Sequence, residues 1–261
     1  MKSQKSAPSK GVYILPNLIT TAAMFSGFYA IIAAINGRFE DAAVAIFIAM
    51  ILDGADGRVA RWTNTQSAFG EQYDSLSDLV SFGVAPAIII YQWSLVHMAD
   101  VSTAWGKLGW MAAFIYAACA ALRLARFNVQ IEEVDKRYFV GLPSPASAGI
   151  LVGLVWFFHD LEVTGNSLQI LALIMTVSAG LLMVSNVSYS SFKDFDYRSK
   201  VPYLAILVIV LVFALTAIDP PKVLLSVFFI YALSGPVFCV LRKLGIVKQM
   251  PEITLPKVDE E

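Results

Sequence analysis

Four aspartates lie close together in the sequence, within or beside apolar stretches where a charged group is costly. Asp53 and Asp56 fall in the second half of one stretch, and Asp74 and Asp78 fall near the start of the next. Even on the cheaper insertion scales, a carboxylate at the centre of a membrane helix costs about 2.5–3.5 kcal/mol. Four such groups therefore require a compensating cation or a water-filled cavity.

The spacing of these residues predicts two facing helix stripes. Positions that differ by three, four or seven residues lie on one face of a helix. The stripes contain Asp53, Asp56, Gly57 and Ala60 on the first helix, and Gly70, Asp74 and Asp78 on the second. A short turn near Asn64 makes the two helices antiparallel neighbours, so the four carboxylates can meet in one pocket.

A cluster of carboxylates predicts a site for a hard divalent cation such as Mg²⁺, Mn²⁺ or Ca²⁺, which prefers oxygen ligands. A zinc site is disfavoured, because His97 and His159 are expected at the opposite membrane face. Cys119 and Cys239 are remote from the aspartates, inside apolar stretches. No histidine is therefore expected to act as a base at this site.

The neighbouring residues suggest that the cation holds a phosphate group. Gly57, Ala60 and Gly70 leave room for a ligand to approach the backbone, and Arg61 offers a planar donor fork suited to phosphate. Small residues in membrane helices also serve close helix packing, and this alternative stays open for each glycine. A purely structural role for the aspartates is less favoured, because only Arg58 and Arg61 are near enough to pair with them.

The elements that must position this site are transmembrane helices. The chain has 261 residues, of which 57% are hydrophobic and 15% are charged, too apolar for a soluble globular domain. A helix needs roughly 20 apolar residues to cross a bilayer. The apolar stretches run over 12–35, 40–62, 67–96, 106–130, 145–159, 168–188, 201–218 and 222–241. They predict an all-α, polytopic transmembrane helical bundle of about eight spans.

The distribution of basic residues predicts the orientation of this bundle. With the N-terminus in the cytoplasm, the predicted inner segments carry 16 Lys and Arg residues and the outer connections carry 3. This bias places both termini in the cytoplasm, in an integral protein of the cytoplasmic (inner) membrane whose active site faces the cytoplasm. One domain is expected over 1–261, with a cytoplasmic segment 1–11, a bundle 12–241 and a cytoplasmic tail 242–261. The net charge of −1, without a basic run, indicates no nucleic-acid partner.

Read in order, the aspartate segment is DGADGRVAR from Asp53 to Arg61, followed by Gly70, Asp74 and Asp78. It resembles the signature of the CDP-alcohol phosphotransferase family, D-x2-DG-x2-AR-x8-G-x3-D-x3-D, at every specified position. The resemblance covers roughly the first six spans. It implies an enzyme that moves a phosphatidyl group from CDP-diacylglycerol to a small alcohol and releases CMP, and it also implies a homodimer.

The resemblance assigns roles to individual residues. It implies that Asp53, Asp56 and Asp74 bind divalent metal, with two ions of Mg²⁺ or Mn²⁺, or else Ca²⁺. Asp78 is the implied fourth metal-side carboxylate and the general base. The residues implied for binding CDP are Asn17, Asp53, Gly57, Ala60, Arg61 and Gly70.

Three further segments resemble the phosphatidylserine synthase branch of that family, which makes L-serine the expected acceptor. They are the stretches at 123–128, 141–146 and 185–193. The candidate serine- or phosphate-binding residues are Arg123, Arg126, Asn128, Gly141, Pro143 and Ser144. An arginine fork suits the carboxylate of serine, whereas inositol or glycerol needs neutral hydrogen-bonding groups. Alternatively, Arg123 and Arg126 anchor their helix to anionic lipid headgroups.

Two other functions are weighed against this one. The nearer is another CDP-alcohol phosphotransferase, with specificity for glycerol phosphate, inositol or an ether lipid. The more remote is a cation transporter, whose pathway should carry polar groups through both leaflets. The segments Ala42–Leu52 and Gly83–Ile90 are almost wholly apolar, which disfavours the transporter.

Overall fold

The computed structural model describes residues 14–130, 138–190 and 203–244, and nearly all regular structure in these ranges is helical. The predicted all-helical class is thus confirmed. The helices are α1 (Ile14–Ile35), α2 (Phe39–Thr63), α3 (Ala68–Asp78), η1 (Leu79–Val84), α4 (Ala85–Trp93), η2 (Leu95–Asp100), α5 (Thr103–Gln130), α6 (Ser144–Asp160), η3 (Gly165–Leu168), α7 (Gln169–Val184), α8 (Tyr203–Ile218) and α9 (Pro220–Lys243). The predicted cytoplasmic segment 1–11 and most of the tail 242–261 lie outside the described residues.

Five helical segments of the described chain are long and apolar enough to cross a membrane, as expected of an integral membrane protein. They are Ile14–Ile35, Ala68–Trp93, Thr103–Val129, Gly165–Val184 and Pro220–Arg242. Each of the eight predicted stretches contains a helix, but three of these helices do not meet the same measure. Helix α2 carries too many charges, and α6 and α8 have only 17 and 16 residues.

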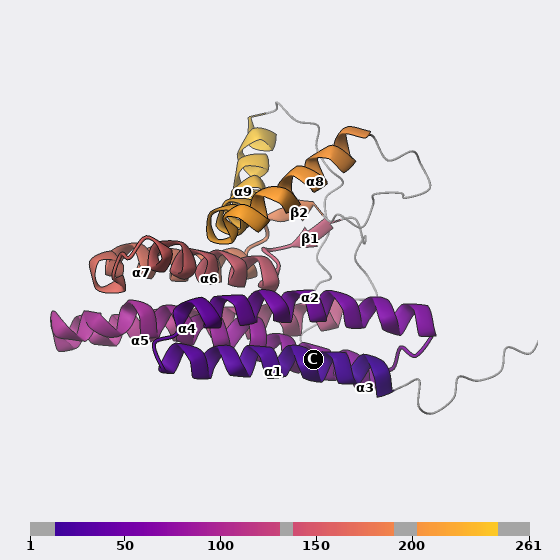
Figure 1. Ribbon diagram of the computed structural model, residues 1–261, viewed down its shortest axis with the longest axis horizontal. Coiled ribbons are helices and arrows are strands. Elements are labelled where there is room, and N and C mark those ends of the chain that lie inside the picture. Colours follow the sequence, from indigo (N-terminus) through magenta and orange to yellow (C-terminus); the bar gives the residue numbers. More distant parts are fainter. Residues whose placement is uncertain (1–13, 131–137, 191–202, 245–261) are drawn as a thin grey trace, which may run out of the picture.

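Figure 1 shows α1 to α7 lying lengthwise beside one another, with α8 and α9 across one side of this bundle. Helix α6 is central, because it packs against α2, α4, α7 and α9. Its sequence explains this position, since the run from Ala146 to Trp156 is apolar or small and is buried throughout.

Small residues bring α1 and α2 close together. The buried alanines at this contact are Ala30, Ala33 and Ala34 of α1, and Ala42, Ala43, Ala45 and Ala49 of α2. The hydroxyl of Ser26 donates to the carbonyl of Ala45 across the contact, at 2.7 Å. Small side chains let helix backbones approach closely in a membrane, and this contact holds α1 beside the helix that carries Asp53 and Asp56.

A turn of four residues separates α2 from α3, where the sequence predicts a short turn. Asn64 ends α2 in the left-handed conformation, with φ of 53°, and its N–H bonds to the carbonyls of Ala60 and Arg61. Ser67 begins α3 as its N-cap and accepts a hydrogen bond from the N–H of Gly70 at 3.0 Å. The two capped helix ends reverse the direction of the chain, so the aspartate-bearing faces of α2 and α3 can meet.

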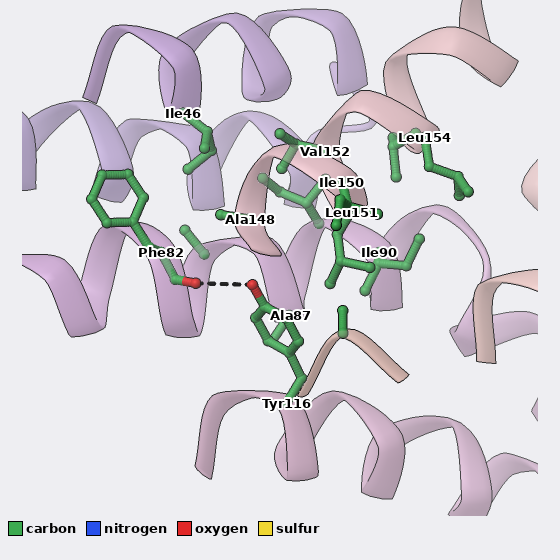
Figure 2. Packing of buried hydrophobic residues seen from close by; sticks show 14 of the residues in the cluster. Ile46, Phe82, Ala87, Ile90, Tyr116, Ala148, Ile150, Leu151, Val152 and Leu154 are labelled. Atoms are coloured by element: carbon green, nitrogen blue, oxygen red, sulfur yellow. Dashed lines mark hydrogen bonds between the residues drawn. The ribbon is translucent and has the colours of Figure 1, made fainter. Parts of the chain in front are cut away.

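The third predicted stretch is less regular than its sequence suggests. It contains the α-helices α3 and α4, joined by the π-helix η1, and is followed by the 3₁₀ helix η2. Tyr116 of α5 donates its hydroxyl to the carbonyl of Phe82 in η1 at 3.1 Å, which Figure 2 shows within the buried core. A π-helix displaces carbonyls from the α-helical ladder, and this hydrogen bond satisfies one of them.

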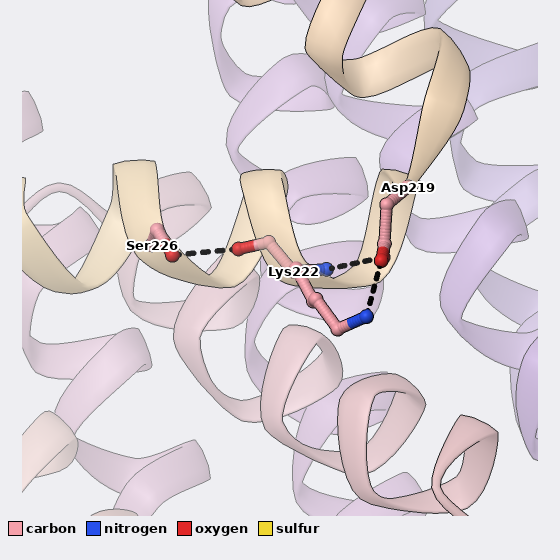
Figure 3. A network of polar contacts seen from close by, with 3 residues as sticks. All are labelled: Asp219, Lys222 and Ser226. Carbon is pink, nitrogen blue, oxygen red and sulfur yellow. Dashed lines mark hydrogen bonds and ion pairs between the residues drawn. The ribbon is translucent and has the colours of Figure 1, made fainter.

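Helix α9 is fixed at its start and along its length. Asp219 precedes the helix and accepts hydrogen bonds from the backbone and side chain of Lys222, shown in Figure 3 together with Ser226. The hydrogen bond from the Lys222 side chain holds the pKa of Asp219 below its ordinary value. Further along, Gly149 of α6 lies against the ring of Phe228, so α6 and α9 pack closely.

A short two-stranded sheet is the exception to the helical fold. Strand β1 (Tyr138–Val140) pairs antiparallel with β2 (Ser188–Ser190). Tyr189 of β2 donates its hydroxyl to the carbonyl of Ala232 at 3.0 Å, which ties the sheet to α9. Burial, together with neighbouring Tyr231, raises the pKa of Tyr189 to about 12.

Candidate active site

The structure brings the four aspartates together at one end of α2 and α3. Asp53 and Asp56 of α2 and Asp74 of α3 each offer a carboxylate oxygen, and these oxygens lie within 4.8 Å of one another. The carboxyl group of Asp78, the last residue of α3, lies beside that of Asp53. The two predicted stripes therefore face each other, and we name these four residues the acid cluster.

The acid cluster fits a hard divalent cation. Its donors are all carboxylate oxygens, which Mg²⁺, Mn²⁺ and Ca²⁺ prefer. Asp56 is only 4% exposed. Oδ1 of Asp74 is buried and has no hydrogen-bond partner among the described residues, so a buried oxygen is left to receive a ligand.

The described histidines are far from this cluster, as the sequence predicts. The ring of His159 packs edge-on against Phe39, with 5.8 Å between ring centroids. Phe39 begins α2, and Asp53 follows fourteen residues later, which corresponds to about 20 Å along a helix. His97 lies in η2, beyond α4 from Asp78. The described chain therefore offers no histidine for a zinc site or for base catalysis here.

A cavity of about 270 Å³ adjoins the acid cluster, and Asp56 and Asp74 form part of its wall. The other lining residues are Pro16, Asn17, Thr20, Gly57, Ala60, Arg61, Thr65, Gln66, Ser67, Gly70, Glu71 and Phe127. Five of the six residues implied for binding CDP are in this wall. The sixth, Asp53, lies in the acid cluster beside it.

The two motif glycines leave space on the cavity side. A Cβ added at Gly57 would meet only the Nη1 of Arg61, at 3.7 Å. A Cβ at Gly70 would lie 3.2 Å from the Oγ of Ser67 and 3.5 Å from the Oδ1 of Asn17, both of which line the cavity. Gly57 therefore makes no close contact with another helix of the described chain, whereas Gly70 lies near Asn17 of α1, so the packing alternative stays open for Gly70.

Sequence reasoning missed several lining residues. Thr20 is the most consequential of them, because its hydroxyl is 2.6 Å from Oδ2 of Asp56. A signal for it exists, since Thr20 lies three and four positions after Asn17 and Pro16 and so shares their helix face. Ser67 is recognisable as an N-cap, but Phe127 reaches the cavity from α5 through tertiary packing alone.

Arg123 and Ser144, two of the predicted acceptor-site residues, lie beside the acid cluster. Nη1 of Arg123 donates to Oγ of Ser144 at 2.8 Å, and the guanidinium interacts electrostatically with Asp78. Nε of Arg123 is buried and has no hydrogen-bond partner within the described ranges. A half-buried cation whose buried Nε has no partner in the described chain, next to carboxylates, can receive an anionic ligand group.

None of the six predicted acceptor residues is in the cavity wall as described, and the other four lie in structural contacts. Arg126 donates to Oδ1 of Asn186 at 3.0 Å, and Nδ2 of Asn128 donates to Ser75 at 3.0 Å. Gly141 has a φ of 81° and lies against the backbone of α7. Pro143 immediately precedes α6.

Comparison with known proteins agrees with this geometry. The sequence pattern of the family described as CDP-alcohol phosphatidyltransferase matches residues 13–184. Among curated proteins, the chain is 36% identical to the CDP-diacylglycerol–serine O-phosphatidyltransferase of Helicobacter pylori over 238 residues, which is 90% of this chain and 96% of the relative.

Relatives in other organisms carry the same name. The protein from the archaeon Methanocaldococcus jannaschii is 36% identical over 73% of this chain and 80% of its own length. The protein from Bacillus subtilis is 32% identical over 69% of this chain and 91% of its own length. The family pattern spans both helices of the acid cluster and every residue that lines the cavity, since the lining residues all lie between 16 and 127. The chain therefore belongs to the CDP-alcohol phosphatidyltransferase family.

Proposed function

We propose that this chain is a CDP-diacylglycerol–serine O-phosphatidyltransferase, which transfers the phosphatidyl group from CDP-diacylglycerol to the hydroxyl of L-serine and releases CMP. One observation carries the proposal: the acid cluster adjoins a cavity of about 270 Å³ on one side and the half-buried Arg123 on the other. Relatives with this name, at 32–36% identity over more than two thirds of the chain, support the choice of substrates.

The acid cluster is the proposed metal site. Asp53, Asp56, Asp74 and Asp78 would hold two divalent cations, Mg²⁺ or Mn²⁺, with Ca²⁺ as a further candidate. When bound, such cations neutralise the diphosphate and stabilise the departing CMP. Oδ1 of Asp74, which is buried and finds no hydrogen-bond partner in the described part of the chain, is consistent with this assignment.

The cavity is the proposed CDP site. Gly57 admits the nucleotide diphosphate close to the backbone of α2, since an added Cβ there would meet only Arg61 among the described residues, and Gly70 adds no side chain to the space beside Ser67 and Asn17. Arg61 presents a planar set of N–H donors to phosphate oxygens at the same wall. Asn17 adds an amide from α1, close to Gly70.

The acceptor is proposed to bind on the Arg123 side of the acid cluster. The guanidinium binds the carboxylate of serine and, with Ser144, directs the serine hydroxyl toward the phosphorus of the CDP-lipid. Asp78 accepts the hydroxyl proton as the new O–P bond forms and the P–O bond to CMP breaks. The electrostatic contact between Arg123 and Asp78 places acceptor and base together.

The eight-span topology is also a proposal, with both termini in the cytoplasm and the site at the cytoplasmic face of the inner membrane. It is supported by the 16-to-3 distribution of basic residues and by helices in all eight apolar stretches. This depth suits the substrates, because one is a membrane lipid whereas serine and CMP are soluble in water. A homodimer is proposed by family resemblance.

The decisive test is an acceptor assay with the purified protein. CDP-diacylglycerol is offered with labelled L-serine, glycerol 3-phosphate or inositol, and CMP release and lipid product are measured with and without EDTA. CMP release with serine alone, abolished by EDTA and restored by Mg²⁺ or Mn²⁺, is the expected result. Turnover with another acceptor would assign the chain to a different branch, and full activity in EDTA would overturn the metal site.

A further inference from the structure

We propose that Thr20 is a positioning residue that orients the carboxylate of Asp56 for the cation and thereby sets the affinity of the metal site, a role that rests on the proposed function. Thr20 is outside the aspartate signature and belongs to another helix, α1. It and Asp56 are each only 4% exposed. The contact between them is therefore shielded from water.

The hydroxyl of Thr20 has two acceptors within reach but only one hydrogen to donate. Its Oγ1 lies 2.6 Å from Oδ2 of Asp56 and 3.1 Å from the carbonyl oxygen of Pro16. A separation of 2.5–2.7 Å is typical of a hydroxyl donating to a carboxylate. If the hydrogen pointed to Pro16 instead, two oxygen lone pairs would face each other at 2.6 Å. The hydrogen therefore points to Asp56.

This hydrogen bond would set the orientation in which Asp56 meets a bound cation. It engages Oδ2 from the α1 side and limits rotation of the carboxylate, so that the group keeps one orientation toward Asp53 and Asp74. Partners that orient metal ligands in this way typically change metal affinity about 10- to 100-fold when they are removed. Thr20 meets that description through its hydrogen bond to Asp56.

The backbone of Thr20 also contacts the other aspartate-bearing helix. Ser77 of α3 lies between Asp74 and Asp78 in sequence, and its hydroxyl donates to the carbonyl oxygen of Thr20 at 3.2 Å. One turn further on, Ser81 donates to the carbonyl of Ala23 at 3.3 Å. Thr20 thus binds α2 through its side chain and α3 through its backbone, and it fixes the separation of the two halves of the acid cluster.

Direct metal binding tests this role. Purified full-length protein is titrated with Mn²⁺, and free Mn²⁺ is measured by electron paramagnetic resonance. Thr20→Ser keeps the hydroxyl, whereas Thr20→Val keeps the shape and removes it. We expect a dissociation constant near that of the wild type for Thr20→Ser and at least about tenfold weaker for Thr20→Val. The Mn²⁺ concentration for half-maximal activity should shift by the same factor, whereas kcat at saturating Mn²⁺ should change much less.

Thr176→Val is the matched control. Thr176 is a fully buried threonine of α7 whose hydroxyl donates to the carbonyl of Ala172 at 2.7 Å, far from the acid cluster in sequence. The control loses the same hydroxyl and an intrahelical hydrogen bond, but its Mn²⁺ dissociation constant should equal that of the wild type. Equal weakening in the control would show that the effect is general loss of stability.

The other possible results of the Mn²⁺ titration also distinguish the role of Thr20 from the proposed function. If Thr20→Val does not fold, Thr20→Ala and Thr20→Ser are compared, since both lack the methyl group and differ in the hydroxyl. Equal Mn²⁺ dissociation constants for the variants with and without the hydroxyl overturn the role of Thr20 and leave the proposed function intact. A wild-type protein that binds no Mn²⁺ overturns both.

Discussion

At Asp78 the two halves of the proposed reaction meet, because its carboxyl group contacts Asp53 on one side and interacts with Arg123 on the other. Asp78→Asn keeps the size of the side chain and removes the proton acceptor. We expect the fold and CDP-diacylglycerol binding to persist while kcat falls about 10²- to 10⁴-fold, the usual contribution of a general base. Thermal unfolding, lipid binding and turnover measure the three effects, and near-normal turnover would refute the role.

Gly57 lies in a helix without a side chain, although no neighbouring helix of the described chain packs close enough to require glycine there. Alanine stabilises a helix interior by up to about 1 kcal/mol relative to glycine, so Gly57→Ala should not lower the melting temperature. Its methyl group projects into the cavity wall, so the KM for CDP-diacylglycerol should rise at least several-fold.

Gly54→Ala is the control for this change, because Gly54 lies in the same helix, also has open space around it, and is not in the cavity wall as described. It should gain the same stability with an unchanged KM. Equal KM values for Gly57→Ala and Gly54→Ala would contradict the placement of the nucleotide beside Gly57.

Arg123 is the residue proposed to bind the carboxylate of the acceptor, L-serine. Arg123→Lys keeps a positive charge but loses the planar fork, and a hydrogen bond to a charged group contributes about 1.5–3 kcal/mol. The kcat/KM for serine should therefore fall about 10- to 100-fold, while the KM for CDP-diacylglycerol changes little. Arg126→Lys is the control, since Arg126 is on the same helix and its side chain donates to Asn186. Similar losses in both variants would favour general anchoring of α5 over serine binding.

At the scale of elements, the helices that carry the signature were predictable and their irregularities were not. The three- and four-residue spacing places Asp53 and Asp56 on one face of α2 because a helix repeats at that interval. The π-helix η1 has no such local signal, since it depends on Tyr116 of α5 to satisfy the carbonyl of Phe82. The contact of Thr20 with Asp56 likewise joins residues 36 positions apart and arises only when α1 and α2 pack.

The small sheet was unpredictable for the same reason. Its strands have three residues each, and pairing of Tyr138 with Ser190 requires α6 and α7 to return the chain. Gly141, which the resemblance places among acceptor-site residues, lies at the turn next to this sheet. Its N–H donates to the carbonyl of Val187 at 2.8 Å, next to the paired strands.

Gly141→Ala should therefore destabilise the protein. Its φ of 81° disfavours any side chain, and an added Cβ would lie 2.2 Å from the carbonyl oxygen of Met183. Gly37→Ala is the control, because Gly37 has a φ of 73° with nothing within 4 Å of the added atom. The left-handed conformation alone costs roughly 1–2 kcal/mol, so Gly141→Ala should lower the melting temperature clearly more than Gly37→Ala. Equal melting temperatures would show that the backbone contact relaxes freely.

At the scale of the whole molecule, the helix order fixes which ends share a membrane face. The turn at Asn36 joins α1 to α2 at the end opposite the acid cluster. The exposed Val129, near the end of α5, lies just beyond Phe127 of the cavity wall and so belongs to the cluster's side. Asn36 and Val129 should therefore be accessible from opposite sides of the membrane.

Single cysteines at these two positions test the orientation, in a background where Cys119 and Cys239 are replaced by alanine. If the active site faces the cytoplasm, a membrane-impermeant maleimide should label Asn36→Cys in intact spheroplasts. It should label Val129→Cys only after the membrane is opened. The reverse pattern would show that the protein has the opposite orientation in the membrane. The serine site would then lie on the side where the 16-to-3 charge bias predicts the outer connections. Labelling of both positions from one side would contradict the antiparallel pairing of α1 and α2 on which the acid cluster depends.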